Sequence, residues 1–310
     1  MAAFFHGVER QFSDRDLQDN HHSAEGFYQI ASALKANFDV APLSELGTVL
    51  ARPDRHRRTV FLISDDGYAN TLEVAADVLR VLGLPWALFV STHHIDSGEP
   101  NPMVVAHQFS RRAPDGTYCL PHIPEPVRLN GPRGAAMVRV RERVRFLPAR
   151  QAKDTLRAMQ DILHERGISL PQSERFLNWD GVRALHTRGV TIGAHAHWHW
   201  AMHRKEEPDF LRQQAQTPKQ RIESELGVGC RHFAYPFGNA RDVSREAWRA
   251  VRDAGYDYAF TTLAGTLAAS KNPWLLPRYG LGRTERNLPA LLPLLRLGNP
   301  RVARWQRGLA

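Results

Sequence analysis

Cysteine is scarce in this chain of 310 residues, where only Cys119 and Cys230 occur. Two cysteines can form neither a disulfide framework nor a cysteine-based zinc site. Long apolar runs are also missing, because the most apolar stretch, residues 288–297, is short and interrupted by two prolines and an arginine. A bilayer-spanning helix needs about 20 apolar residues. We therefore expect neither a disulfide-stapled scaffold nor an integral membrane protein.

The first residues, MAAFFHGVERQ, lack the basic start and the apolar stretch of a secretory signal peptide. A cytoplasmic location is the resulting expectation. The chain also has no internal repeat and no low-complexity linker, and its content of hydrophobic residues (43%) and charged residues (24%) is that of a globular protein.

Positive charge is in excess, with 41 Lys and Arg against 32 Asp and Glu and a net charge of +9. Arginine supplies nearly all of it. Such a balance favours anionic partners, among them phosphates and anionic lipid headgroups. No helix-turn-helix, RNA-binding signature or zinc finger accompanies the charge, so we predict no nucleic-acid partner.

Short apolar runs alternate with amphipathic stretches, a pattern typical of parallel βαβ units. The predicted strands are 2–5, 60–63, 86–90, 190–192, 232–235 and 258–262. The predicted helices are 23–38, 71–82, 149–166 and 244–254, and the last three end at glycines. The chain therefore has the pattern of an α/β protein.

Two segments stand apart from this alternation. Residues 100–148 are rich in proline and carry arginines at 139, 141, 143 and 145, which would share one face of a strand or spread around a helix. The segment is either a solvated insertion or a basic wall near an anionic substrate. Residues 288–310 are apolar and then basic, which suits either a terminal helix packed on the domain or contact with an anionic membrane.

Two acids end the apolar run Val60–Ile63, in the sequence Ile-Ser-Asp65-Asp66-Gly67-Tyr. Neighbouring side chains on a strand point to opposite faces, so both acids can serve one site only where the strand ends and the chain turns. Gly67 permits that turn. The carboxyl ends of parallel strands are where α/β folds place their sites, although a solvated acidic turn would read the same way.

Three histidines follow the next such run, in His195-Ala-His197-Trp-His199. The four-residue spacing brings His195 and His199 to one side of either a strand or a helix, whereas His197 joins them only on a strand. Two imidazoles and one carboxylate are a common catalytic zinc set that leaves a position open for water. We predict a metal site here. A third signal, Phe233-Ala-Tyr-Pro-Phe-Gly238, is a strand and a turn whose backbone N–H groups could face an oxyanion.

Together, and in this order, the three motifs resemble the polysaccharide deacetylases with the NodB homology domain, carbohydrate esterase family 4. The flanking segments LGLPWALFVST, FLNWDGVRAL, AGYDYAFTT and LPRYGL fit as well, so the resemblance extends from about residue 4 to residue 282. It implies a distorted (β/α)7 barrel. We expect one barrel domain over 1–287 with an insertion at 100–148, and then the tail 288–310.

Carried over by position, the resemblance implies that Asp65 is the catalytic base and that the metal ligands are Asp66, His195 and His199. It implies a divalent metal, most often Zn²⁺, with Ni²⁺ or Co²⁺ also compatible. His197 is not a ligand in the family pattern. The backbone N–H of Phe237 matches the oxyanion donor, and Tyr235 shapes the turn beside it.

Two positions depart from the commonest family pattern. Ala234 stands where the third motif usually carries an arginine that orients the base, and the late histidine that acts as general acid is missing. The variant third motif resembles the poly-N-acetylglucosamine deacetylase branch, in which a first-strand histidine takes the acid role. His6 is the corresponding residue. Arg231 lies near the third motif but at a different offset, so we do not assign it to the base.

The resulting functional prediction is a metal-dependent hydrolase that removes an N-acetyl group from an amino sugar. The substrate would be a polysaccharide or a lipid- or nucleotide-linked precursor, and the basic tail would hold the enzyme near the inner face of a membrane. Two alternatives stay open: a hydrolase of another amide, such as a formamide or a cyclic imide, and a carbohydrate-binding protein without catalysis.

Overall fold

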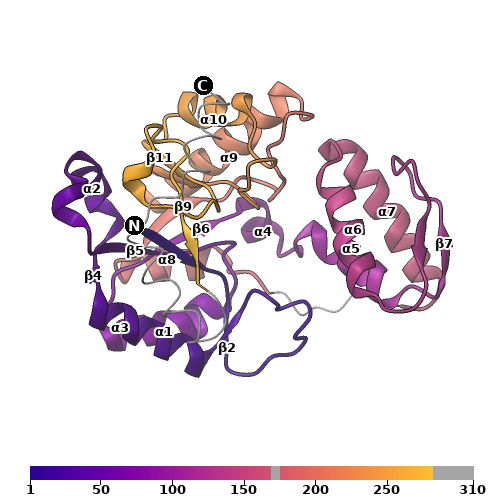
Figure 1. Cartoon of the computed structure of the whole chain (residues 1–310), viewed down its shortest axis with the longest axis horizontal. Coiled ribbons are helices and arrows are strands. Elements are labelled where there is room, and N and C mark those ends of the chain that lie inside the picture. The colour runs from indigo at the N-terminus through magenta and orange to yellow at the C-terminus, as the bar shows by residue number, and fades with distance from the viewer. Residues whose placement is uncertain (169–174, 282–310) are drawn as a thin grey trace.

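The computed structural model of the chain describes residues 1–168 and 175–281 (Figure 1). The predicted tail, 288–310, lies outside the described residues. Within the described part, no helix combines the length and the apolar character that crossing a bilayer requires.

The larger part of the molecule is built on an eight-stranded sheet. Seven of its strands follow the order β11-β10-β9-β6-β5-β1-β12, and β4 pairs with β5 beside this path. All of its paired strands run parallel. The strands are β1 (Ala2–Phe5), β4 (Asp39–Val40), β5 (Thr59–Ser64), β6 (Ala87–Val90), β9 (Thr191–Ala194), β10 (His232–Ala234), β11 (Tyr258–Phe260) and β12 (Tyr279–Gly280). Each of the six predicted strands is confirmed, with ends that differ by at most two residues.

The segment after β11 closes the sheet into a ring. Leu276 exchanges backbone hydrogen bonds with residues 259 and 261 beside β11, and a few residues later Tyr279 and Gly280 pair with β1. One short stretch of chain therefore bridges the two edges of the sheet. The α/β class and the distorted (β/α)7 barrel are confirmed, and the distortion lies at this irregular closure.

Alternating side chains on the strands separate two hydrophobic layers. On β5, Phe61 and Ile63 belong to the inner cluster of the barrel, whereas Val60 and Leu62 pack outward against the helices. The outer layer is covered by α1 (Ala24–Asn37), α3 (Ala76–Leu82), α8 (Trp179–Thr187), α9 (Pro208–Leu226) and α10 (Arg245–Asp253). Burial on both faces explains why the strands read as unbroken apolar runs.

The predicted helices are confirmed, with one local difference. The stretch predicted as a helix over 71–82 begins with a π-helical turn, Thr71–Ala75, before α3. Shorter elements complete this part of the chain. They are β2 (Val8–Glu9), β3 (His22–Ser23), α2 (Leu46–Ala51), α4 (Thr92–Ser97) and the 3-10 turns Leu43–Glu45, Pro53–His56 and Leu267–Ala269.

A lobe with its own hydrophobic cluster projects from the barrel (Figure 1). It consists of α5 (Pro102–Arg112), the antiparallel pair β7 (Gly116–Tyr118) and β8 (Val127–Leu129), α6 (Gly134–Arg145) and α7 (Ala149–Glu165). The arginines at 139–145 are therefore helical and spread around α6. Leu156, Met159 and Leu163 of α7 join the lobe cluster, so this packing unit extends past Pro148.

Gly193 in β9 offers a test of the barrel packing. A Cβ atom there would lie 2.4 Å from Phe89 Cε1 and 3.0 Å from the carbonyl oxygen of His232. We expect Gly193→Ala to lower the free energy of unfolding by about 1–3 kcal/mol because it overpacks the interior. Urea denaturation measures this.

The matched control is Gly134→Ala at the start of α6, where a Cβ atom meets nothing within 4 Å. That change should leave the free energy of unfolding unchanged or raise it by at most about 1 kcal/mol. Equal effects of the two substitutions would contradict the packing described for β9.

Candidate metal centre and active site

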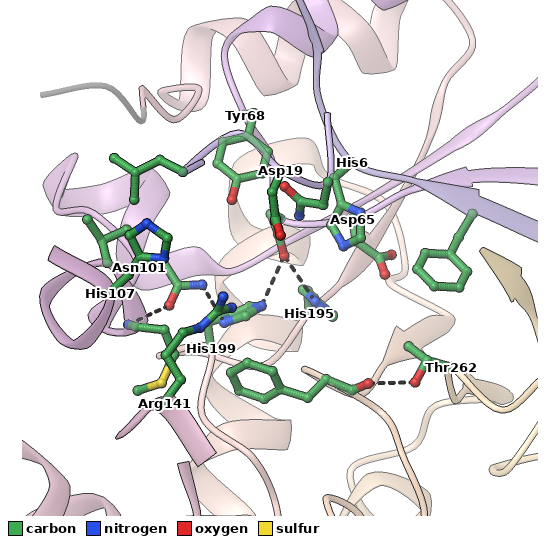
Figure 2. Close-up of a pocket in the computed structure, with 17 residues that line it drawn as sticks. His6, Asp19, Asp65, Tyr68, Asn101, His107, Arg141, His195, His199 and Thr262 are labelled. Atoms are coloured by element: carbon green, nitrogen blue, oxygen red, sulfur yellow. Dashed lines mark hydrogen bonds and ion pairs between the residues drawn. The ribbon is translucent and has the colours of Figure 1, made fainter. Parts of the chain in front are cut away.

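A pocket of about 310 Å³ lies where the parallel strands end (Figure 2). Its barrel side is lined by residues that directly follow strands, namely His6 after β1, Asp65 and Asp66 after β5, His195 and His199 after β9, Phe237 after β10 and Thr262 after β11. The carboxyl ends of parallel strands meet at one end of a barrel. The fold thus brings together residues as distant in sequence as His6 and Thr262.

Strand alternation decides which side chains enter this pocket. Asp65 continues the inward series Phe61 and Ile63, and His6 is two residues beyond Phe4, which packs on the inner cluster. Tyr235 is instead on the outward face with Phe233. Its hydroxyl donates to the carbonyl oxygen of Trp274 at 3.0 Å, and its side chain does not line the pocket.

Asp66, His195 and His199 form the candidate metal centre. One ligand atom from each lies within 4.8 Å of the others, and all three side chains are buried. Oδ1 of Asp66 is 3.2 Å from Nε2 of His195 and 3.0 Å from Nε2 of His199. Neither contact has hydrogen-bond alignment, which leaves this buried oxygen without a hydrogen bond among the described residues.

The hydrogen bonds of the two imidazoles orient them toward Asp66. The Nδ1–H of His195 donates to the carbonyl oxygen of Ala234 at 2.8 Å, so Nε2 is the ring nitrogen that faces Asp66 and is placed to act as a ligand. The amide of Asn101 contacts Nδ1 of His199 at 2.7 Å. Two imidazoles and a carboxylate with an unsatisfied oxygen match the donor set of zinc-type catalytic sites. These residues therefore fit a divalent metal ion.

Left-handed backbone at the strand ends produces this convergence. Gly67 has φ +89°, as its position in the acidic turn predicts, and Asp66 (φ 76°) shares the left-handed region with Ala196, His199 and Phe237. Such conformations cost non-glycine residues about 1–3 kcal/mol each and cluster at functional sites. His195 and His199 lie on the loop after β9 rather than on a strand or helix. The side chain of His197 points elsewhere, and its Nδ1 contacts Oγ1 of Thr92 at 2.8 Å.

Asp65 is held by an arginine that the sequence analysis does not assign. Nη1 and Nη2 of Arg278 donate to the two carboxylate oxygens of Asp65, each at 2.8 Å, and Nε donates to the carbonyl oxygen of Thr261. Both side chains are buried. Burial by itself would raise the pKa of Asp65, but the charges of Arg278 and His195 outweigh it and lower that pKa. Asp65 is thus a carboxylate at neutral pH.

The signal for Arg278 is present in the sequence, in the segment Leu-Pro-Arg278-Tyr near the end of the family resemblance. An arginine between apolar residues that read as core needs a buried partner. Arg231, the arginine closest to the third motif, instead forms an exposed ion pair with Asp257.

His6 and the backbone of Phe237 complete the barrel side of the pocket. Burial lowers the pKa of His6, although the charges of Asp66 and Asp65 act in the opposite direction. The backbone N–H of Phe237 makes no hydrogen bond to any described residue. It is therefore available to a ligand.

The lobe supplies the facing wall of the pocket through Met103, Val104 and His107 of α5 and Arg141 of α6. Asn101 and Asp19 also line it. None of these residues is assigned individually in the sequence analysis. Residues 100–148 are treated there as either a solvated insertion or a basic wall, and Arg141 is one of the four arginines on which the second alternative depends.

The fold and the site define an α/β barrel with a buried Asp-His-His cluster at the carboxyl ends of its strands. The sequence profile of polysaccharide deacetylases matches residues 52–259. The chain belongs to the polysaccharide deacetylase family. A search of curated protein sequences found no match.

Solved structures share the fold at low sequence identity. A Streptococcus pyogenes deacetylase in complex with acetate has a TM-score of 0.61 at 13% identity, covering 93% of this chain and 96% of its own. A de-N-acetylase from Aggregatibacter actinomycetemcomitans has a TM-score of 0.60 at 15% identity, covering 94% and 98%. IcaB from Ammonifex degensii has a TM-score of 0.55 at 13% identity, covering 96% and 97%.

Replacing Arg278 tests the buried ion pair. We expect Arg278→Met to lower the free energy of unfolding by about 3–5 kcal/mol, because it leaves Asp65 as an uncompensated buried charge. Arg231→Met, which breaks an exposed pair, should cost no more than about 1 kcal/mol. Chemical denaturation of both variants checks the difference.

The double variant Asp65→Leu/Arg278→Met separates charge burial from lost packing. It should recover most of the stability that Arg278→Met loses, because the unpaired carboxylate is gone. If Arg278→Met is no less stable than Arg231→Met, the assigned role of Arg278 is wrong.

Proposed function

We propose that this protein is a metal-dependent hydrolase that removes an N-acetyl group from an amino sugar of a glycan or of a lipid- or nucleotide-linked precursor. The observation that carries the proposal is the position of Asp65, paired with Arg278, next to the Asp66, His195 and His199 cluster in one pocket. A carboxylate base beside a candidate metal centre is the arrangement that metal-assisted hydrolysis of an amide needs.

Asp66, His195 and His199 would hold the cation, for which Zn²⁺, Ni²⁺ and Co²⁺ are all compatible. When bound, such a cation acts as a Lewis acid and lowers the pKa of water at the site. Asp65 accepts the proton of the attacking water as its oxygen forms the new bond to the acyl carbon. Arg278 keeps Asp65 ionised and fixes both of its oxygens, so the base is ready before the substrate arrives.

The remaining roles go to Phe237 and His6. The N–H of Phe237 donates to the acyl oxygen as negative charge develops there. The C–N bond then breaks, and His6 gives a proton to the leaving amine. Because burial lowers the pKa of His6, the ring is neutral at pH 7. The proton that it delivers would therefore come from the attacking water, through Asp65.

Two other functions remain as alternatives. Hydrolysis of a formamide or a cyclic imide would use the same residues, so only a substrate panel separates it from deacetylation. A carbohydrate-binding protein has no use for a buried Asp65–Arg278 pair, and a buried ion pair is costly to build. A cytoplasmic location and contact of residues 288–310 with an anionic membrane stay predictions.

Metal binding should depend on Asp66 and not on the neighbouring histidine that points away. We expect about one divalent cation per chain in the purified protein, lost in Asp66→Ala and retained in His197→Ala. Elemental analysis before and after dialysis against a chelator, followed by zinc titration, measures the stoichiometry. Retention of the cation by Asp66→Ala would contradict the assigned centre.

Substitution of Asp65 should abolish catalysis but leave the metal content of the protein unchanged. We expect Asp65→Asn to reduce kcat by at least about 10²–10⁴-fold, the usual contribution of general base catalysis. Turnover is measured on N-acetylglucosamine oligomers together with N-formyl sugars and cyclic imides, and circular dichroism and elemental analysis verify the fold and the metal. Near-wild-type activity of Asp65→Asn would exclude this mechanism.

A further inference from the structure

The pocket has two chemically different sides. Figure 2 shows His6 and Asp65 on one side and Asn101, His107 and Arg141 together on the other, with His195 and His199 between them. The first side comes from the barrel and holds the residues of the proposed reaction. The second comes mainly from the lobe, and the proposed reaction uses none of its side chains to bind or transfer a proton.

Arg141 differs from the other α6 arginines that face neighbouring elements. Arg143 pairs with Glu125, and Arg145 pairs with Asp242. Among the described residues Arg141 forms no ion pair with any carboxylate, although its side chain is half-buried in the pocket wall. A guanidinium that is partly removed from water without a counter-charge carries a free-energy cost unless a ligand supplies the charge.

His107 lies on the same wall and is also incomplete. Its side chain is 5% exposed, and its buried Nε2 has no hydrogen-bond partner among the described residues. Burial, followed by the charge of Arg141, lowers the pKa of His107. The ring is therefore neutral at pH 7, and its Nε2–H tautomer is a hydrogen-bond donor. A buried polar atom normally has a partner, so this atom points to a missing one.

The acidic residues of the pocket do not neutralise this wall. Asp65 is already paired with Arg278, and Asp66 belongs to the candidate metal centre. Asp19, at the edge of the same wall, has an interaction of its own, and its charge raises the pKa of His107 against the larger effect of burial. The positive charge of Arg141 is thus left for a ligand.

The lobe holds this wall in a fixed position relative to the reacting side. Nε of Arg145 lies 3.3 Å from Oδ1 of Asp242, a buried residue of the loop after β10. The same guanidinium lies 5.2 Å from the ring centroid of Phe237. Arg141 is one helical turn before Arg145 on α6. The contacts of Arg145 therefore also fix the position of Arg141 relative to the turn that contains Phe237 and its backbone N–H.

We propose that Arg141 and His107 form a subsite for an anionic substituent, a phosphate ester or a carboxylate, on the acylated amino sugar. The planar guanidinium of arginine matches both oxyanions with two parallel hydrogen bonds. This inference rests on the proposed function and deepens it, because it makes the substrate an anionic amino sugar and the lobe the part of the chain that selects it.

Binding measured by calorimetry tests the subsite separately from turnover. The probes are N-acetylglucosamine 1-phosphate, N-acetylglucosaminuronic acid and the neutral methyl N-acetylglucosaminide. Wild-type protein should bind one of the two anionic sugars at least about tenfold more tightly than the neutral one, the ratio expected from one charge-assisted contact. The anion that binds more tightly identifies the substituent.

Two variants on one helix form the matched comparison. Arg141→Ala should abolish the anionic preference, whereas Arg139→Ala, which removes the same charge from an exposed position on α6, should retain it. In turnover, Arg141→Ala should raise KM for the anionic sugar toward the KM of the neutral sugar, whereas Arg139→Ala should keep the two KM values apart. Equal behaviour of the two variants would overturn the proposal.

Metal-stripped protein provides the last control. The preference should persist without the cation, since neither Arg141 nor His107 is a proposed ligand, and a preference that disappears would place the anion on the metal and overturn the subsite. If no sugar is hydrolysed but the Arg141-dependent preference holds, the subsite stands and the deacetylase function fails. If sugars are hydrolysed with no anionic preference, the function stands and the subsite fails.

Discussion

The buried ion pair between Asp65 and Arg278 joins the closure of the barrel to its chemistry. The two residues are 213 positions apart, and each lies at a structural junction: Asp65 at the end of β5, Arg278 in the segment that bridges β11 and β1. Two charges in the interior are tolerable only when each satisfies the other. The closing segment therefore serves both to complete the ring and to hold the carboxylate that the proposed reaction needs.

Around this pair, the barrel positions functional groups by strand alternation and by strained turns. His6, Asp65 and His195 point inward because they extend the inward-facing positions of their strands, while Asp66, His199 and Phe237 reach the pocket through left-handed backbone. The hydrophobic layers on both sides of the sheet offset the cost of these conformations. The site is consequently part of the packing rather than an addition to a finished scaffold.

The lobe gives the pocket a second wall with its own hydrophobic cluster. Barrel and lobe meet through Arg145, which contacts both Asp242 and the ring of Phe237. In the proposed function the barrel side carries the reaction, and in the proposed subsite the facing helices of the lobe contact the anionic substituent of the sugar.

Local patterns in the sequence determined the strands, the main helices and the acidic turn at Gly67, because periodicity and turn residues act over short stretches of chain. The order of the three motifs, through the family resemblance, identified Asp66, His195 and His199 as the candidate cluster. Only the tertiary structure decided that Arg278 rather than Arg231 holds Asp65, that the Tyr235 hydroxyl faces away from the pocket and that α6 brings Arg141 to it. These outcomes depend on where the barrel closes and on how the lobe packs against it. Such contacts join residues that are distant in sequence, and no local pattern encodes which of several arginines will meet which carboxylate.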